Sequence, residues 1–321
     1  MIVQRPDWGS YKAQLKRLFE ASFAKPMSTD YLDWRYYDND RELLLFSIEK
    51  SGTAPVADLA ASYSAFPVVL ERNGQALSAA LSMTTMTHPD WRGRGLFPRL
   101  ATELYAFAAE RGVALVWGFP NANSHATFQS KLGWQDIYEI PTLQLRYDVA
   151  VVAAMRSSER VERDDAFVKT YPAMPADGLV RSRRDQRYLT WRYAKNPVHE
   201  YRTYVLSRDS VLSESAQVTS YVVTKRYGEG VDLIDIQCAD RDEARVLLEH
   251  IIRVSAGDGA RFANCWAPTH HWLHGVLERL GFKNTVPVTY VGGRILQAAA
   301  FDFDIFDHRN WYIQMGDSDV Y

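Results

Sequence analysis

The chain has few cysteines, no long apolar run and almost no excess of charge of either sign. It contains 2 cysteines among 321 residues and has a formal net charge of -2. Two cysteines cannot form a disulfide framework, so a reducing compartment is expected. The small net charge gives no electrostatic reason to expect a nucleic acid or an anionic membrane as a partner. Because no apolar run approaches membrane-spanning length and the first residues lack an apolar signal core, we expect a cytoplasmic protein.

The length suits two domains, and the sequence repeats itself. The segment Tyr31–Tyr36, YLDWRY, recurs as Tyr188–Tyr193, YLTWRY, and Leu-Gly-Trp at 132–134 recurs as Leu-Gly-Phe at 280–282. Matches that fall in the same order predict an internal duplication, and the repeated aromatic spacing favours core packing. We predict one module at 1–150, a linker at 151–187, a second module at 188–298 and a tail at 299–321 that packs on the modules.

A glycine-rich loop joins a predicted strand to a predicted helix in the first module. Residues 76–86 form a small, apolar run typical of a strand, and apolar residues recur at helical spacing over 100–108. Gly93, Gly95 and two arginines lie between them. Glycines let a ligand approach the backbone, and the free N–H groups of a helix start favour phosphate. We predict a phosphate-binding loop that is neither a P-loop nor a Rossmann loop, whose third glycine is replaced by Pro98.

Arg92-x-x-Gly95 in this setting resembles motif A of the GNAT acetyltransferase superfamily, which binds the pyrophosphate of acetyl-CoA. Phe97 stands where the family pattern has a small residue, so its side chain is expected to point back into the core. The segment 121–134 resembles the family's Asn-x-x-Ala/Ser…Tyr-x-Lys-Leu-Gly-Phe segment. The predicted element order of the first module, closed by a hairpin over 133–147, is also that of the family. The resemblance implies an α/β (α+β) fold of two tandem GNAT-like modules, each a twisted mixed sheet flanked by helices.

The resemblance also implies that acetyl-CoA, as co-substrate, is held largely by main chain of the first module. The end of the strand would pair with the pantetheine arm, and the loop N–H groups would face the pyrophosphate. The two loop arginines either add charge or face solvent, and the proline fits the first helical turn. The residues expected to bind the cofactor are Met86, Thr87, His88, Arg92, Gly93, Arg94, Gly95, Leu96, Phe97, Pro98, Asn121, Ser124 and Phe128.

The second module lacks such a loop. Its equivalent stretch, Cys238–Glu243, has no glycine and carries three carboxylates, which suit a helix start but repel pyrophosphate. We therefore predict one cofactor site per chain. In the same module, His270, His271 and His274 resemble a zinc pattern but lack the glutamate beside the first histidine. A structural role or a pocket wall is expected there, and no metal.

Catalytic residues are less plainly marked. In the family, a tyrosine of this segment commonly protonates the CoA thiolate. Counting forward from Asn121 places Phe128 at the position of that tyrosine, and counting back from Gly133 places Gln129 there. Neither residue is an acid. His125 could act as a base near neutral pH, or it could be a capping or surface histidine.

The aromatic tail is similar to the C-terminal segment of some tandem GNAT proteins, where the chain end closes over the active site. Asp317, Asp319 or the terminal carboxylate of Tyr321 could then supply negative charge for an amine. The alternative is a tail that only covers a hydrophobic seam. Of these groups, His125 and Tyr321 are the predicted catalytic residues.

We therefore expect an N-acetyltransferase that moves an acetyl group from acetyl-CoA to a primary amine of a small molecule, of the amino sugar or amino acid type. Because no cysteine precedes Cys238, transfer is expected to be direct, in a ternary complex. The alternatives are a non-catalytic acyl-CoA-binding or regulatory protein, and an aminoacyl or longer-chain acyltransferase on the same fold. The expected partner is the amine substrate, and the expected assembly is a monomer or a homodimer.

Overall fold

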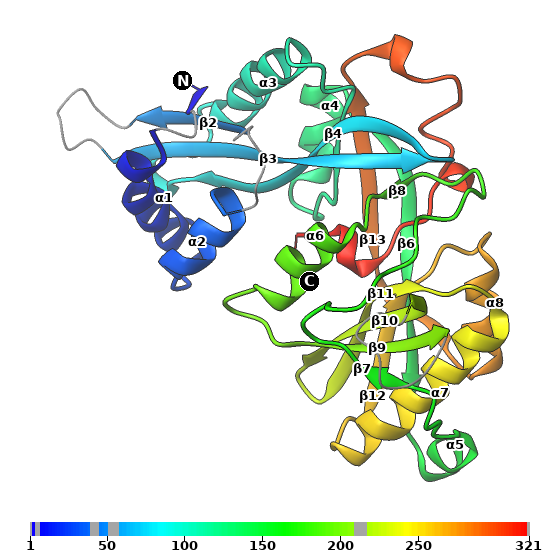
Figure 1. Ribbon diagram of the computed structural model, residues 1–321. Coiled ribbons are helices and arrows are strands. Elements are labelled where there is room, and N and C mark those ends of the chain that lie inside the picture. Colours follow the sequence, from blue (N-terminus) through cyan, green and yellow to red (C-terminus); the bar gives the residue numbers. More distant parts are fainter. Residues whose placement is uncertain (1, 4–6, 39–44, 51–57, 209–216, 320–321) are drawn as a thin grey trace. The chain divides into compact units, whose positions relative to one another are not determined.

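Strands and helices alternate along the chain in the computed structural model, which describes residues 2–3, 7–38, 45–50, 58–208 and 217–319 (Figure 1). The chain divides into two compact units. Unit 1 consists of Met1–Glu71, Gln75–Tyr138 and Tyr290–His308, and unit 2 of Arg72–Gly74, Glu139–Thr289 and Arg309–Tyr321. Unit 2 thus takes in all of the segment 151–187. The predicted α/β class, with mixed sheets flanked by helices, is confirmed.

Unit 1 is a sheet between helices. Its elements are β1 (Ile2–Val3), α1 (Trp8–Phe23), α2 (Thr29–Tyr36), β2 (Leu45–Lys50), β3 (Leu59–Arg72), β4 (Gln75–Thr87), η2 (Pro89–Trp91), α3 (Leu96–Ala109), β5 (Leu115–Gly118), α4 (His125–Leu132) and η4 (Ala298–Ala300). The strand order is β1-β2-β3-β4-β5, followed by the end of β13 (Lys283–Ile295). Figure 1 shows α1 and α2 on one side of the long strands β3 and β4, and α3 on the other. A tight turn follows β3 at Asn73 and Gly74, whose φ angles are 51° and 78°.

Helix α3 is amphipathic and packs its apolar face on the sheet. Leu100, Leu104 and Ala108 follow one another at helical spacing and share a core cluster with Ala61 and Tyr63 of β3. Burial of each leucine side chain contributes roughly 1.5–3 kcal/mol, which holds the start of the helix firmly against the strands.

Unit 2 is the rest of the chain. Its elements are β6 (Gln135–Arg146, from Glu139 on), α5 (Val149–Ala154), β7 (Glu162–Arg163), β8 (Arg181–Ser182), α6 (Gln186–Leu189), the π-helical turn η3 (Thr190–Ala194), β9 (Tyr201–Arg208), β10 (Gln217–Tyr227), β11 (Gly230–Gln237), α7 (Arg241–Gly257), β12 (Phe262–Trp266), α8 (Trp272–Arg279), the start of β13 and η6 (Met315–Asp317), with η5 (His308–Asn310) at its border. Its strand order is β6-β12-β11-β10-β9-β7. Helices α7 and α8 pack on this sheet and on each other through one apolar core.

The order of elements in the first half of the chain recurs in the second half. In each half a helical segment with the repeated Tyr-Leu-x-Trp-Arg-Tyr sequence precedes three strands, a helix, a strand, a helix and a last strand, which is β6 in the first half and β13 in the second. The third of these strands pairs in parallel with the fourth in both units, β4 with β5 and β11 with β12. The repeated Trp34 and Trp191 are both buried, so the prediction of core packing for them is confirmed.

The hairpin predicted for 133–147 is wrong, because β6 is one continuous strand. Residues 135–146 contain no glycine or asparagine that could reverse the chain, and Ile137, Ile140, Leu143 and Leu145 are all buried. Thr142–Arg146 pairs antiparallel with β12 of unit 2. The neighbour of β5 in unit 1 is Gly292–Ile295 of β13, whose residues lie 174 to 180 positions further along the chain.

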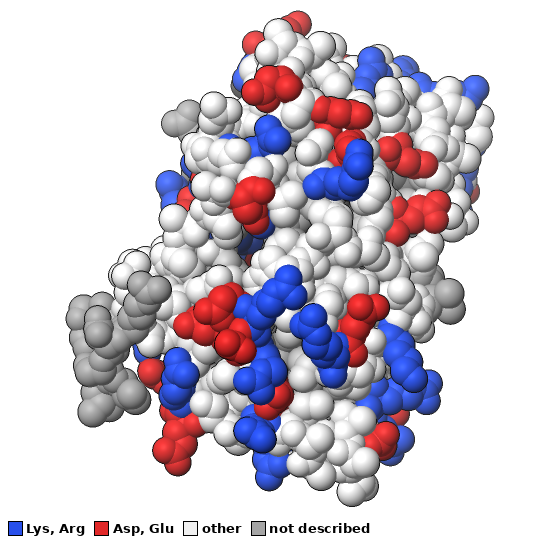
Figure 2. Space-filling view, turned by 90° about the vertical axis from the view of Figure 1, so that its right-hand side faces the viewer, with Lys and Arg blue, Asp and Glu red and all other residues white. Residues whose placement is uncertain are grey.

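No helix among the described residues is both long and apolar enough to cross a bilayer. Acidic and basic side chains lie interspersed on the face shown in Figure 2.

Candidate functional site

The candidate site of unit 1 begins where β4 extends beyond the end of β5. Ala79–Ser82 pairs in parallel with Leu115–Gly118, and β4 then continues to Thr87 without β5 beside it. Within this extension Thr84 has a φ of 43°, a left-handed conformation that a β-branched residue rarely adopts. The strand is therefore irregular at this point, and beyond Ser82 its edge is open to a hydrogen-bonding partner other than β5.

The loop after β4 has the geometry of an anion site. Gly93 and Gly95 have φ angles of 75° and 68°, and Gly95 is the N-cap of α3. A Cβ built on either glycine would meet no atom within 4 Å, so the surface above the loop is clear. The loop lines a pocket of about 170 Å³ together with Thr87 and Trp91. The N–H groups of the first helical turn have no intrahelical partner and attract negative charge, and Pro98 lacks an N–H only where none is needed.

The two predicted arginines lie at the rim of this pocket, and both are exposed. The Arg92 Nη2 atom donates to the Ser22 carbonyl oxygen at 3.2 Å, and the Arg94 Nη2 atom donates to the Asp90 carbonyl oxygen at 3.2 Å. The Arg94 guanidinium also lies 4.4 Å from the centre of the Trp91 ring. Each arginine is thus held beside the loop with its charge in solvent, where it can attract a phosphate group.

Two of the predicted cofactor residues support the loop from below. The Phe97 ring packs at 5.7 Å from Tyr63 and 5.1 Å from Phe128, so it points back into the core as its place in the motif requires. Phe128 is only 5% exposed and packs at 4.3 Å against Trp134. Its side chain therefore acts by packing under the loop, and Leu96 is buried in the same cluster.

Sequence reasoning missed a buried hydrogen-bond chain beneath the point where β4 and β5 part. The Tyr63 hydroxyl lies 2.8 Å from Ser82 Oγ and 3.0 Å from the Tyr105 hydroxyl, to which Trp134 Nε1 donates at 2.9 Å. Burial raises the pKa of Tyr63 to about 12 and that of Tyr105 well above its ordinary value. Both phenols therefore stay neutral and fix the strands and α3 in place. Nothing in the spacing of these residues marks them as partners.

The three predicted residues at the end of β4 differ in what they offer. Thr87 lines the pocket, whereas the Met86 side chain is buried in the core. The His88 N–H donates to the Ala60 carbonyl oxygen at 2.8 Å, and its Nδ1 atom accepts from the Asp90 N–H at 3.3 Å. The amide of His88 is therefore already engaged with β3, and the main chain of Met86 and Thr87 is the better placed partner for a ligand.

Asn121 and Ser124 shape the start of α4. The Asn121 Oδ1 atom accepts from the N–H groups of Asn123 and Ser124 at 3.0 and 3.1 Å and lies 3.2 Å from Ser124 Oγ. This turn fixes the next residue, His125, at the beginning of the helix. Both predicted residues thus have a local structural role, which leaves the Asn121 amide nitrogen as the group that can reach a ligand.

His125 forms a dyad with a carboxylate that the sequence did not single out. Its Nε2 atom lies 2.7 Å from Asp136 Oδ1, and its ring stacks on Tyr290 at 4.1 Å between centres. Gln129, which is one of the two candidates for the position of the family tyrosine, donates through Nε2 to Asp136 Oδ2 at 2.7 Å. A carboxylate partner orients an imidazole, which is the arrangement of a general base. His125 is not among the residues that line the pocket at the loop.

The equivalent helix start in unit 2 is filled by its own carboxylates. Asp240 is the N-cap of α7, and its side chain accepts from the N–H groups of Asp242 and Glu243 at 2.9 and 2.8 Å. The Glu243 carboxylate accepts from Thr219 Oγ1 and Ser220 Oγ at 2.7 and 2.5 Å. The N–H groups that could hold a phosphate are therefore occupied, and negative charge surrounds them.

The last part of the tail, from Arg309 on, belongs to unit 2. Asp317 Oδ1 accepts from Arg184 Nη2 at 2.7 Å, and both side chains are 3% exposed. Arg184 Nε also donates to Asp235 Oδ2 at 2.5 Å. The interpretation of Asp317 as a charge for an amine substrate is thereby corrected, because its carboxylate is buried and neutralised. Tyr321, the predicted catalytic chain end, lies outside the described residues.

The three histidines of the zinc-like pattern each bond a different main-chain group. His270 Nε2 lies 2.9 Å from the Trp311 carbonyl oxygen, and His274 Nδ1 lies 3.0 Å from that of Ala267. His271 Nδ1 accepts from the Leu273 N–H at 3.3 Å and caps α8. Among the described residues, no group of three or more His, Cys, Asp or Glu side chains is placed to hold a metal.

Known proteins resemble this chain in sequence over one segment and in fold over most of its length. Residues 9–137, less than half of the chain, match the family model described as an acetyltransferase (GNAT) domain. Among solved structures, a conserved protein of unknown function from Enterococcus faecalis, described as a probable N-acyltransferase, has a TM-score of 0.66 at 13% identity. The match covers 94% of this chain and 73% of the Enterococcus faecalis chain.

Two further structures are similar. A GCN5-related N-acetyltransferase from Anabaena variabilis has a TM-score of 0.65 at 12% identity, covering 91% of this chain and 72% of its own. A GCN5-related N-acetyltransferase from Kribbella flavida has a TM-score of 0.64 at 13% identity, and the match covers 93% of this chain and 71% of the Kribbella flavida chain. At these identities the likeness establishes the fold alone. No curated protein matches the sequence significantly.

Proposed function

We propose that the GNAT-type acetyltransferase domain at residues 9–137 binds acetyl-CoA and transfers its acetyl group to a primary amine of a small molecule. The observation that carries the proposal is the loop with left-handed Gly93 and Gly95, which opens α3 directly after the part of β4 that extends beyond β5. The N–H groups of Gly93 to Phe97 would hold the pyrophosphate, and the main chain of Met86 and Thr87 would take up the pantetheine amides. Arg92 and Arg94 would add charge at the rim.

The residues present fit direct transfer. The domain has no cysteine, so no acyl-cysteine intermediate forms there. The amine must arrive without its proton, and the His125–Asp136 dyad is the group in this unit best built to accept that proton. Phe128 is buried and Gln129 is not an acid, so the departing thiolate of CoA takes its proton from water.

The helix start in unit 2 favours one cofactor site per chain. We interpret its repeated element order as a duplicated module whose loop has been lost, because Asp240 occupies the N–H groups at the start of α7. Two equal acetyl-CoA sites would contradict this interpretation. A cytoplasmic location and a monomeric or homodimeric state remain predictions.

Calorimetry with acetyl-CoA tests the binding step. We expect one molecule bound per chain, and no binding would rule out both an enzyme and an acyl-CoA sensor. Release of free CoA thiol with a panel of primary amines then tests transfer.

The second candidate function is a non-catalytic acyl-CoA-binding protein. The observation in its favour is that neither Phe128 nor Gln129 can protonate a thiolate. Stoichiometric binding without thiol release for any amine in the panel would select it over the enzyme.

A further inference from the structure

Strand β4 is bent just where it leaves β5. Ser82 is the last residue of β4 that pairs with β5, and its partner is Gly118. Two residues later, Thr84 has the left-handed φ of 43°. A β-branched residue keeps this conformation only where its surroundings hold it there. A group close to Thr84 must therefore fix the bend.

Hydroxyl groups from α2, β3 and β4 hold the bend at Thr84. Ser64 Oγ donates to the Met83 carbonyl oxygen at 2.9 Å. The Tyr36 hydroxyl forms hydrogen bonds with the side chains of Ser64 and Thr84. Because Ser64 gives its only proton to the carbonyl, it accepts from Tyr36, and the Tyr36 oxygen accepts from Thr84. This chain of hydrogen bonds begins and ends on opposite sides of the N–Cα bond of Thr84, and rotation about that bond is φ. It therefore fixes φ directly.

Tyr36 is a rigid and permanent donor in this chain. Its side chain is 6% exposed, and its ring packs at 5.5 Å from the ring of Trp8 in α1. Burial raises the pKa of Tyr36 to about 12, so its hydroxyl keeps its proton at neutral pH. The conformation of Thr84 is thus tied to a side chain that neither moves nor ionises.

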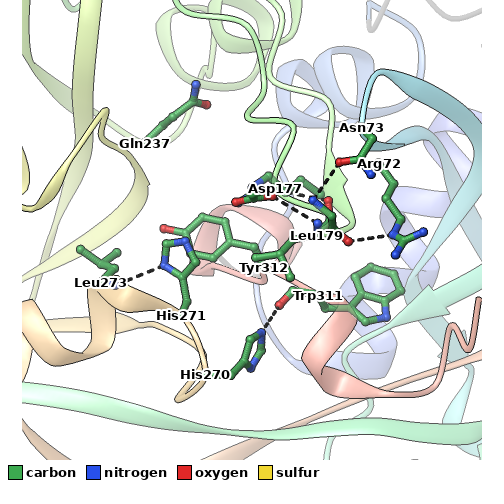
Figure 3. Close-up of polar contacts among 12 residues, drawn as sticks. Arg72, Asn73, Asp177, Leu179, Gln237, His270, His271, Leu273, Trp311 and Tyr312 are labelled. Carbon is green, nitrogen blue, oxygen red and sulfur yellow. Dashed lines mark hydrogen bonds and ion pairs between the residues drawn. The ribbon is translucent and has the colours of Figure 1, made fainter.

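The matching tyrosine of the repeated segment has a different partner in unit 2. Tyr193 donates to Asp235 Oδ2 at 2.7 Å, and β11, which the structure describes in full, has no residue with a positive φ. The next residue, Ile236, has its carbonyl oxygen bonded by the Tyr312 hydroxyl at 2.9 Å. Figure 3 shows this Tyr312 beside His271. Of the two equivalent strands, only the one that leads into the glycine loop is bent.

The bend decides which main-chain groups of β4 face a ligand, because rotation about one bond turns every peptide that follows. The proposed function, on which this inference rests, assigns the main chain of Met86 and Thr87 to the pantetheine arm. We propose that Tyr36 is a positioning residue for acetyl transfer, which holds the bend at Thr84 and so aligns the thioester without contacting it. Reaction rates depend steeply on such alignment.

Tyr36→Phe tests this role, because it removes the hydroxyl and keeps the packed ring. We expect kcat for acetyl transfer to fall roughly tenfold, since a misaligned thioester reacts more slowly. The affinity for CoA without an acetyl group should stay within roughly twofold, because the loop that opens α3 is untouched. An unchanged kcat, or a loss of CoA affinity as large as the loss of kcat, would overturn the proposal.

Two substitutions of Thr84 separate the hydrogen bond from the shape of the side chain. Thr84→Val keeps the shape without the hydroxyl and should lower kcat as much as Tyr36→Phe, whereas Thr84→Ser keeps the hydroxyl and should retain kcat within roughly twofold. The double variant of Tyr36→Phe and Thr84→Val should be no slower than the slower single variant, because both changes break one chain. Equal losses in Thr84→Val and Thr84→Ser, or losses that multiply in the double variant, would refute the chain. The two Thr84 variants also decide the matter if Tyr36→Phe does not fold.

A second measurement does not depend on turnover. Acetyl-CoA labelled with ¹³C at its acetyl carbonyl gives an NMR signal that reports the surroundings of the bound thioester, and Tyr36→Phe should shift this signal. Tyr147→Phe is the matched control, because the hydroxyl it removes lies 2.9 Å from Ser255 Oγ in unit 2. It should change neither the signal nor kcat.

The same signal separates the two ways in which the inference can fail. If the unaltered protein gives no signal from bound acetyl-CoA, the proposed function is wrong and this inference falls with it. If the unaltered protein and Tyr36→Phe give the same bound signal, acetyl-CoA binding stands and only the role of Tyr36 is refuted.

Discussion

Gly95 and Asp240 hold the same position in their units, each as the N-cap of the helix that follows a strand with a parallel neighbour. Gly95 has a φ of 68° and brings no side chain, so the N–H groups of α3 face open space. Asp240 adopts an extended conformation and bonds two N–H groups of α7 with its own carboxylate. One helix start is therefore available to an anion, and the other contains one already.

Gly95→Glu should abolish acetyl-CoA binding and leave the fold intact. The new carboxylate would lie where the pyrophosphate is expected, and we expect affinity to fall roughly a hundredfold, about 3 kcal/mol. The left-handed φ adds a strain of about 1–2 kcal/mol to the folded state. Gly112→Glu is the control, because Gly112 has a φ of 79° just after the other end of α3. Calorimetry measures both, and retained binding in Gly95→Glu would refute the assigned loop.

Asp240→Ala should destabilise unit 2 without creating a second acetyl-CoA site. Loss of the cap costs about 1 kcal/mol, whereas Asp240→Asn keeps an acceptor and should cost less. Urea unfolding monitored by circular dichroism gives the difference. Binding stoichiometry should stay at one, since Asp242 and Glu243 still surround the helix start with negative charge. A second bound acetyl-CoA would show that the cap alone had closed the site.

Arg184→Met should destabilise the protein strongly. It leaves Asp235 and Asp317 buried without their cation, and breaking a buried pair costs about 3–5 kcal/mol. Arg202→Met, which breaks an exposed pair with Asp258, is the control and should cost at most about 1 kcal/mol. Equal losses in denaturant unfolding would contradict this difference. For the same reason, a test of the terminal carboxylate should remove Tyr321 alone and spare Asp317.

Stability should fall as the pH drops from about 6.5 to about 4, in part through His271. Burial lowers the pKa of His271 to about 4 from an ordinary 6.5, so in this interval the unfolded chain takes up a proton that the folded chain does not. This group alone accounts for up to about 3 kcal/mol of that loss. His271→Asn preserves a good N-cap for α8 and removes the titration, so its stability should fall less over the same range. Parallel pH profiles for the two proteins would argue against a depressed pKa.

His125→Gln should lower kcat for acetyl transfer by roughly a hundredfold and leave acetyl-CoA affinity unchanged. Asp136→Asn should lower kcat less, because the imidazole remains but loses its carboxylate. His308→Gln, which removes a histidine stacked on Tyr138, is the control and should retain activity. If kcat of His125→Gln equals that of the unaltered protein, the dyad only fixes α4 against β6.

Features of the fold that depend on residues close together in the sequence could be predicted from the sequence. Helix α3 and the glycine loop before it follow from local spacing and conformational preference. The partners of β6 and β13 could not be predicted, because these strand pairs join residues 116 to 180 positions apart and depend on closing long loops. Asp136 and Tyr290 were missed for a related reason. They lie on separate strands and meet His125 only through tertiary packing.

The position in the sequence of the strand that pairs with β5 also has a consequence for folding during translation. Gly292–Ile295, which completes the sheet of unit 1 there, leaves the ribosome more than 170 residues after β5, Leu115–Gly118. Until then the nascent unit exposes an unpaired strand edge, which invites association with other chains. Unit 1 therefore completes its sheet only after Ile295 has been synthesised. Expression of residues 1–187 alone would yield a chain that a separately supplied C-terminal half must complement.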